Sequence, residues 1–124
     1  ILSELLERDD TVFVISSDFC HWGKNFGYSP YTGDQEIYKY IERLDHEGID
    51  HIKKLDLKWF NAYLSITNNT ICGRNPIMLF LSTISNSKFS QKTNVELLYY
   101  AQSSQVKKHS QSSVSYSSIL FHVW

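Results

Sequence analysis

The sequence predicts a single α/β domain in which helices cover a small sheet, and three observations lead to this prediction. A β-branched run from Thr11 to Ile15 lies between polar residues, which favours a buried central strand. An amphipathic pattern over Gln35 to Glu47 predicts a helix. Two later stretches, Val95 to Ala101 and Ser113 to Phe121, are strand-like. Strands that alternate with helices are typical of a layered α/β domain, here spanning residues 1–124.

The N-terminal region predicts a short helix, a strand and then a long loop. Leu2, Leu5 and Leu6 have helical spacing, and the Asp9-Asp10 pair ends that pattern. After the predicted strand, the stretch from Gly23 to Asp34 contains three glycines and a proline, which indicates a loop.

The central region predicts three helices. The first, Gln35 to Glu47, has apolar residues at positions i, i+3, i+4 and i+7, and Gly48 is expected to end it. Asp56 is a good N-cap for a second helix that continues through Leu64. The Asn75-Pro76 pair predicts an N-cap followed by proline, which would open a third helix over Ile77 to Ile84.

Composition excludes several classes of protein. The net charge is −1 and no more than two Lys or Arg are adjacent, which argues against nucleic-acid binding. No apolar run approaches the roughly 18 residues that a membrane-spanning helix needs, and the first residues lack the features of a signal peptide. Two cysteines are too few for a disulfide framework. We therefore expect a cytoplasmic protein without membrane insertion, and the start at Ile1 rather than methionine suggests a fragment of a longer chain.

The stretch SSDFCHWG, residues 16–23, follows the predicted strand and concentrates reactive side chains. His21 could bind a metal or transfer a proton, and Asp18 could orient its ring. The alternative is a polar turn with His21 and Trp22 packed beneath it. Cys20 is expected to be a small buried core residue.

The stretch TICGRNP, residues 70–76, places a cysteine just before a predicted helix. The helix N-terminus and the cation of Arg74 would favour the thiolate form of Cys72, which could bind a soft metal or act in redox chemistry. The alternative is an inert buried cysteine beside an arginine that pairs with a carboxylate.

Together, the stretches SSDFCHWG, EIYKYIERLD, NTICGRNPI, LLYYAQSSQ and SSVSYSS resemble the Memo family. The similarity runs in order from about Leu5 to about Ser118. It covers only the C-terminal part of the family, whose members are much longer. The resemblance implies a three-layer α/β/α fold like that of class III extradiol dioxygenases, present here as a C-terminal portion.

The resemblance also implies a site. By motif, His21 and Cys72 correspond to metal ligands for iron or copper, which the family completes with two histidines from its N-terminal part. Asp18 corresponds to the family's aspartate before that histidine, and Trp22 and Arg74 are expected beside the pocket. This chain departs from the family pattern TICGRHP by carrying Asn75.

Three functions follow as hypotheses. The resemblance implies a signalling protein of the cell-motility type on a metallo-dioxygenase-like scaffold, which recognises a phosphotyrosine-containing partner and binds metal when complete. The alternative is a metal-dependent oxidoreductase, although no turnover is expected from this portion alone. A third hypothesis, independent of the family, is a reactive-thiol protein that uses Cys72.

Overall fold

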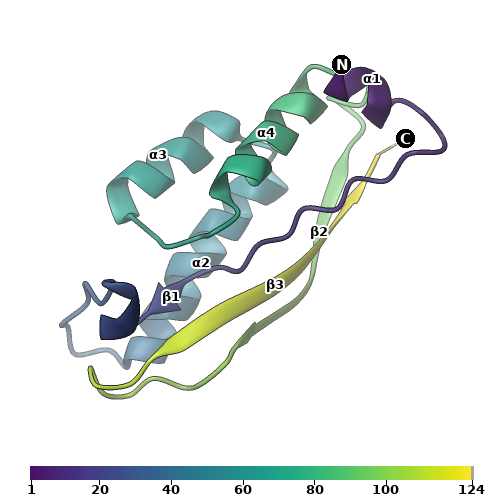
Figure 1. Cartoon of the computed structure of the whole chain (residues 1–124). Helices are drawn as coiled ribbons and strands as arrows, with labels where there is room; N and C mark the ends of the chain where they lie inside the picture. Colours follow the sequence, from purple (N-terminus) through teal and green to yellow (C-terminus); the bar gives the residue numbers. More distant parts are fainter. Residues whose placement is uncertain (124) are drawn as a thin grey trace.

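The structure is a computed structural model that describes residues 1–123. It is a mixed α/β domain, as the sequence predicts, with four α-helices, one 3₁₀-helix and three strands in the described part. Figure 1 shows them in chain order: α1 (Leu2–Leu6), β1 (His21–Trp22), the 3₁₀-helix η1 (Lys24–Phe26), α2 (Ile37–Lys53), α3 (Leu57–Thr67), α4 (Arg74–Ser85), β2 (Asn94–Gln102) and β3 (Ser113–His122).

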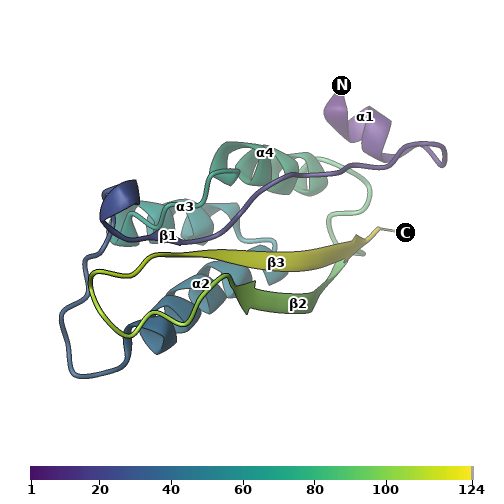
Figure 2. The same ribbon diagram turned by 60° about the horizontal axis from the view of Figure 1, so that its bottom comes forward.

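The sheet is antiparallel and has the order β1-β3-β2. Strands β2 and β3 form a long ribbon whose register runs from Asn94 opposite His122 to Gln102 opposite Ser115. The register shifts once, between Leu97 and Tyr99. Figure 2 shows β1 beside the start of β3, where it adds a short third strand.

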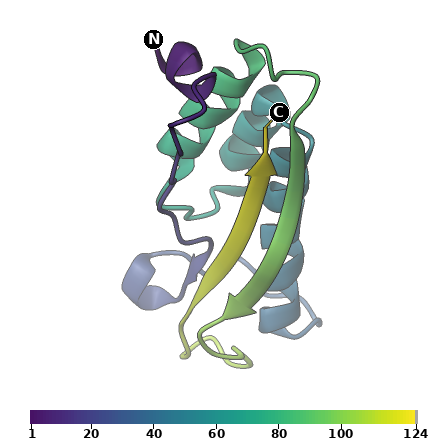
Figure 3. The same cartoon turned by 90° about the vertical axis from the view of Figure 1, so that its right-hand side faces the viewer.

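Helices α2, α3 and α4 gather on one side of this ribbon, as Figures 1 and 3 show. Their apolar faces and the start of the sheet enclose one main core. Its most buried members include Trp22 from β1, Ile41 and Ile49 from α2, Phe60 from α3 and Leu81 from α4. Burial of this apolar surface is the dominant favourable term in folding.

The predicted buried strand over Thr11 to Ile15 is wrong. The segment is extended but has no strand partner among the described residues, and Val12 and Val14 are 85% and 87% exposed. Its backbone makes no hydrogen bond to any other described residue. β-Branched residues favour an extended conformation, but a strand also requires a neighbouring strand to pair with.

Two helix boundaries also differ from the prediction. Helix α2 does not end at Gly48 but continues to Lys53. A Cβ at Gly48 would lie 2.8 Å from the ring of Tyr63, so the glycine allows α2 and α3 to approach closely rather than ending the helix. Helix α4 begins at Arg74, with Gly73 as its N-cap, so Asn75 is inside the helix. Pro76 is then the third helical residue, still in the turn whose N–H groups have no partner within the helix.

Most other expectations for helices and strands are confirmed, although α2 begins at Ile37 rather than Gln35 and the predicted loop contains η1. The carboxylate of Asp56 caps α3 by accepting a hydrogen bond of 3.0 Å from the backbone N–H of Trp59. The two C-terminal strands lie where the sequence predicts them, each one residue longer at one or both ends. Within residues 1–123, no helix combines the length and apolar character needed to cross a membrane.

Candidate functional site

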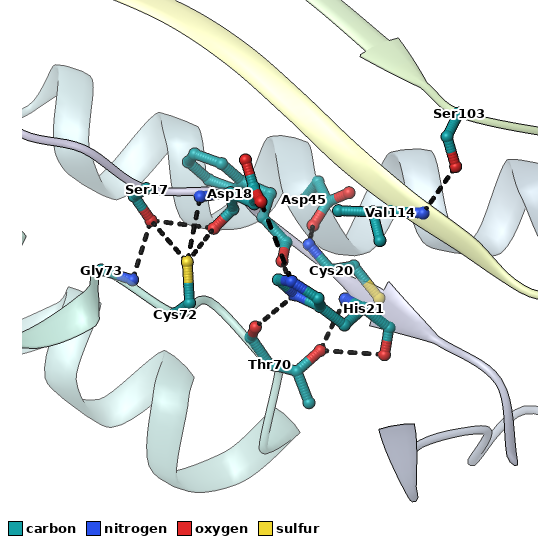
Figure 4. Close-up of polar contacts among 11 residues, drawn as sticks. Ser17, Asp18, Cys20, His21, Asp45, Thr70, Cys72, Gly73, Ser103 and Val114 are labelled. Atoms are coloured by element: carbon teal, nitrogen blue, oxygen red, sulfur yellow. Dashed lines mark hydrogen bonds and ion pairs between the residues drawn. The ribbon is translucent and has the colours of Figure 1, made fainter. Parts of the chain in front are cut away.

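Asp18, His21 and Cys72 form the one group of three potential metal ligands among the described residues. A carboxylate oxygen, a ring nitrogen and the sulfur lie within 4.8 Å of one another. Figure 4 shows that two segments supply them: the extended chain that leads into β1, and the loop that leads into α4. Asp18 and Cys72 are 54 positions apart in the sequence, so the fold, rather than local spacing, brings the group together.

Strand β3 fixes the backbone around His21. The backbone N–H of Phe19 donates to the carbonyl of Ser115 at 2.8 Å, and the N–H of Ser115 donates to the carbonyl of Cys20 at 2.9 Å. His21 then pairs with Val114 as β1 begins. Asp18 is therefore three residues before the strand and His21 is its first residue, whereas the sequence placed both after a strand.

The hydroxyl of Thr70 attaches the second segment to the first. It accepts a hydrogen bond of 2.7 Å from the backbone N–H of His21 and donates one of 3.1 Å to the carbonyl of the same residue. One side chain thus satisfies both backbone groups of His21. Because Thr70 is two residues before Cys72, this contact sets how the cysteine approaches β1.

The sulfur of Cys72 is held against the backbone of Asp18. The backbone N–H of Asp18 donates to Sγ at 3.1 Å, and the N–H of Gly73 donates to the hydroxyl of Ser17 at 2.9 Å. A Cβ at Gly73 would lie only 2.4 Å from Cβ of Ser17, so this approach requires glycine. Cys72 is exposed, which contradicts the alternative of an inert buried cysteine.

The hydrogen bonds of His21 define which ring nitrogen is available. Nδ1 lies 2.9 Å from the carbonyl of Phe19 and 3.0 Å from the carbonyl of Thr70. Carbonyl oxygens only accept, so Nδ1 carries the proton in the neutral ring and Nε2 has the free lone pair. Nε2 lies 3.9 Å from Oδ2 of Asp18. The nitrogen that can bind a metal therefore faces the carboxylate.

Of the two residues expected beside the pocket, Trp22 lies in the core, and Arg74 lies at the start of α4, two residues after Cys72. Trp22 is fully buried, and its ring packs edge-on against those of Tyr28 and Tyr40, which makes it a core residue. Arg74 is exposed at the start of α4 and forms no ion pair with another residue in 1–123. Cys20 is completely buried, as expected.

Ser17 and Thr70, which hold the two segments together, were not singled out by the sequence. Both lie within the quoted stretches, SSDFCHWG and TICGRNP, but serine and threonine are common in turns and give no distinct signal. An apolar groove of about 380 Å³ lies between the extended segment and β3; Ser17 lines it, but Asp18, His21 and Cys72 do not. Its walls include Phe13, Ile15, Phe80 and Phe121.

Comparison with known proteins places these features in a family. The family profile described as "Memo-like protein" matches residues 1–120. The "Protein memo-1 homolog" of Caenorhabditis elegans is 43% identical over 126 aligned residues, which cover 98% of this chain and 36% of that protein. The "Protein MEMO1" of Homo sapiens and of Danio rerio are each 46% identical over 118 residues, covering 94% of this chain and 40% of theirs. The chain thus spans about two fifths of the length of these relatives.

Proposed function

Because the chain belongs to the Memo-like protein family, we propose that it contributes one half of a metal site to a protein that binds other proteins. The observation that supports this proposal most directly is the clustering of Asp18, His21 and Cys72 within 4.8 Å. The three donors fit a metal that accepts mixed ligands: thiolate suits copper(I), while imidazole and carboxylate suit iron. Iron and copper are therefore the metals we propose.

The arrangement of His21 supports the proposal further. Metal-binding histidines usually donate their second ring N–H to a carbonyl or carboxylate, which fixes the tautomer and the ring orientation. Here Nδ1 donates to two backbone carbonyls, and Nε2 points toward Asp18.

The site would be open rather than closed. Asp18 and His21 are partly exposed and Cys72 is exposed, so further ligands can reach the same position. We propose that the complete protein supplies them and has the three-layer fold of the class III extradiol dioxygenases. The sheet described here corresponds to only part of that fold.

Binding of metal is tested by titrating the chain with copper(I) or iron(II) under anaerobic conditions, in competition with a chromophoric chelator. His21→Ala and Cys72→Ser should each weaken binding at least about tenfold, since each removes one donor. His109→Ala is the matched control, because His109 is exposed in a loop outside the group. Near-ultraviolet circular dichroism should show that all three variants are folded. Binding by His21→Ala and Cys72→Ser equal to that of the parent would contradict the site.

A protein partner is the second part of the proposal. Arg74 presents an exposed guanidinium in the first turn of α4, two residues after Cys72. Guanidinium groups and helix N-termini both favour phosphate. This combination supports recognition of a phosphotyrosine-containing segment next to the metal site.

A metal-dependent oxidoreductase is the second candidate function, and the exposed sulfur of Cys72 favours it. Oxygen electrode measurements on the iron- or copper-loaded protein distinguish the two. A binding protein should consume oxygen no faster than the same concentration of free metal. Consumption above that level that disappears in Cys72→Ser would establish the oxidoreductase instead.

A further inference from the structure

We propose that Asp45 is a positioning residue that sets the distance between His21 and Cys72. This inference rests on the proposed metal site. Asp45 belongs to α2 and is fully buried, far along the sequence from the two motifs. It has no direct contact with either ligand and would act through the residues next to them.

One oxygen of Asp45 joins the two segments that carry the ligands. Oδ1 accepts a hydrogen bond of 3.1 Å from the backbone N–H of Cys20 and another of 2.9 Å from the side-chain amide of Asn69. Cys20 immediately precedes His21, and Asn69 precedes Thr70 and is three residues before Cys72. A single atom therefore bridges the two backbones close to both ligands.

The orientation of Asn69 is fixed by a further chain of hydrogen bonds. Its Nδ2 also donates to the hydroxyl of Tyr63 at 2.9 Å, and that hydroxyl donates to the carbonyl of Leu44 at 2.6 Å. Helices α2 and α3 thus hold the amide in place from two sides. Because Asn69 is fully buried, it has little freedom to turn away.

The second oxygen of Asp45 points in another direction. Oδ2 accepts a hydrogen bond of 2.7 Å from the hydroxyl of Tyr100 on β2. This contact ties α2 to the far strand of the sheet. The Tyr100 hydroxyl also lies 3.3 Å from the hydroxyl of Ser115 on β3, but it does not contact the loop that carries Cys72. The hydrogen bonds of Oδ1 and of Oδ2 can therefore be removed by separate substitutions.

A buried carboxylate needs a reason, because an apolar residue would fill the same space at lower cost. Burial raises the pKa of Asp45, and its hydrogen bonds oppose that shift. All its hydrogen-bond donors within residues 1–123 are neutral. No apolar side chain could accept hydrogen bonds from both segments, as Oδ1 of Asp45 does.

The decisive experiment compares Asn69→Ala with Tyr100→Phe. Each variant removes one donor to Asp45, but only the first cuts the arm that reaches the Cys72 loop. Copper(I) affinity should fall about tenfold or more in Asn69→Ala, equivalent to about 1.4 kcal/mol, and change less than about twofold in Tyr100→Phe. Equal losses in the two variants, after both are shown to be folded, would overturn the proposal.

Two substitutions at position 45 give an independent comparison. Asp45→Asn keeps an oxygen that can accept from Cys20 and Asn69, and it turns an amide toward Tyr100, whose hydroxyl can accept. It should retain copper(I) affinity within about threefold, whereas Asp45→Ala should lose about tenfold. If Asp45→Ala does not fold, the comparison of Asn69→Ala with Tyr100→Phe still decides.

Hydrogen exchange in the metal-free protein separates this proposal from the metal site itself. The amide of Asp18 donates to Sγ of Cys72, so its exchange rate reports the spacing of the two segments without metal. The rate should rise about tenfold in Asn69→Ala beyond any change in global stability, and should be unchanged in Tyr100→Phe. If the unsubstituted protein binds no copper(I) but the two variants show this exchange pattern, the metal site is refuted and the role of Asp45 stands. An unchanged Asp18 rate in Asn69→Ala would refute the role of Asp45.

Discussion

The two cysteines occupy opposite environments, although both lie within motifs of the family. Cys20 is completely buried, and burial raises the pKa of its thiol. Cys72 is exposed, and its sulfur accepts a hydrogen bond from the backbone N–H of Asp18. Of the two thiols, that of Cys72 should therefore react faster with reagents from solution.

Labelling by iodoacetamide near neutral pH tests this difference. Cys72 should react roughly a hundredfold faster than Cys20, because Cys20 becomes accessible only when the core opens. Cys72→Ser is the control, and should leave only the slow reaction. Prior addition of copper(I) should suppress the fast reaction if the thiolate binds metal. Fast labelling of Cys72 that copper(I) leaves unchanged would favour the reactive-thiol hypothesis. Equal, slow labelling of both cysteines would contradict that hypothesis.

At the level of elements, the loop before α4 brings Cys72 to Asp18 and His21. The close approach of Gly73 to Ser17 leaves no room for a side chain at position 73. The backbone φ of Gly73 is −91°, an angle that any residue adopts. The requirement for glycine here is therefore steric, which gives the loop a specific point of contact with the extended segment.

Gly73→Ala should force these two segments apart. We expect a loss of about 1–3 kcal/mol in the free energy of unfolding, the usual cost of overpacking, measured by chemical denaturation. Copper(I) affinity should fall as well, because Cys72 moves with the loop. Asn75→Ala is the matched control, since Asn75 is exposed two positions later in the same region. Loss of stability without any loss of affinity would show that the loop does not position Cys72.

For the whole molecule, the sequence predicts regular elements well where periodicity decides them. The helices around Ile41 and Phe60 and the two C-terminal strands follow from their apolar spacing. The segment Thr11 to Ile15 could not be predicted in this way, because composition reports the preference for an extended backbone and not the presence of a partner strand. A glycine in a helical pattern was equally ambiguous, because it can end a helix or, as Gly48 does, allow two helices to pack closely.

The site was predictable only in part, for a related reason. The motifs and the family resemblance singled out Asp18, His21 and Cys72, but no spacing rule places residues 54 positions apart together. The polar residues that fix them, Thr70 and Asp45, have no periodic signal. Asp45 was indistinguishable in the sequence from the other acidic residues of a helix that is charged on its outer face. Buried polar contacts of this kind depend on the tertiary structure.

The pairing of β1 with β3 has a consequence for the order in which the molecule folds. His21 pairs with Val114, so the strand that begins with a candidate ligand needs a partner near the other end of the chain. Contacts between residues so distant in sequence form late, because the entropy of closing the loop must be offset first. During synthesis on the ribosome, β1 must wait until β3 has emerged. The candidate ligands would therefore reach this arrangement only after β3 has been translated, because the backbone around His21 pairs with that strand.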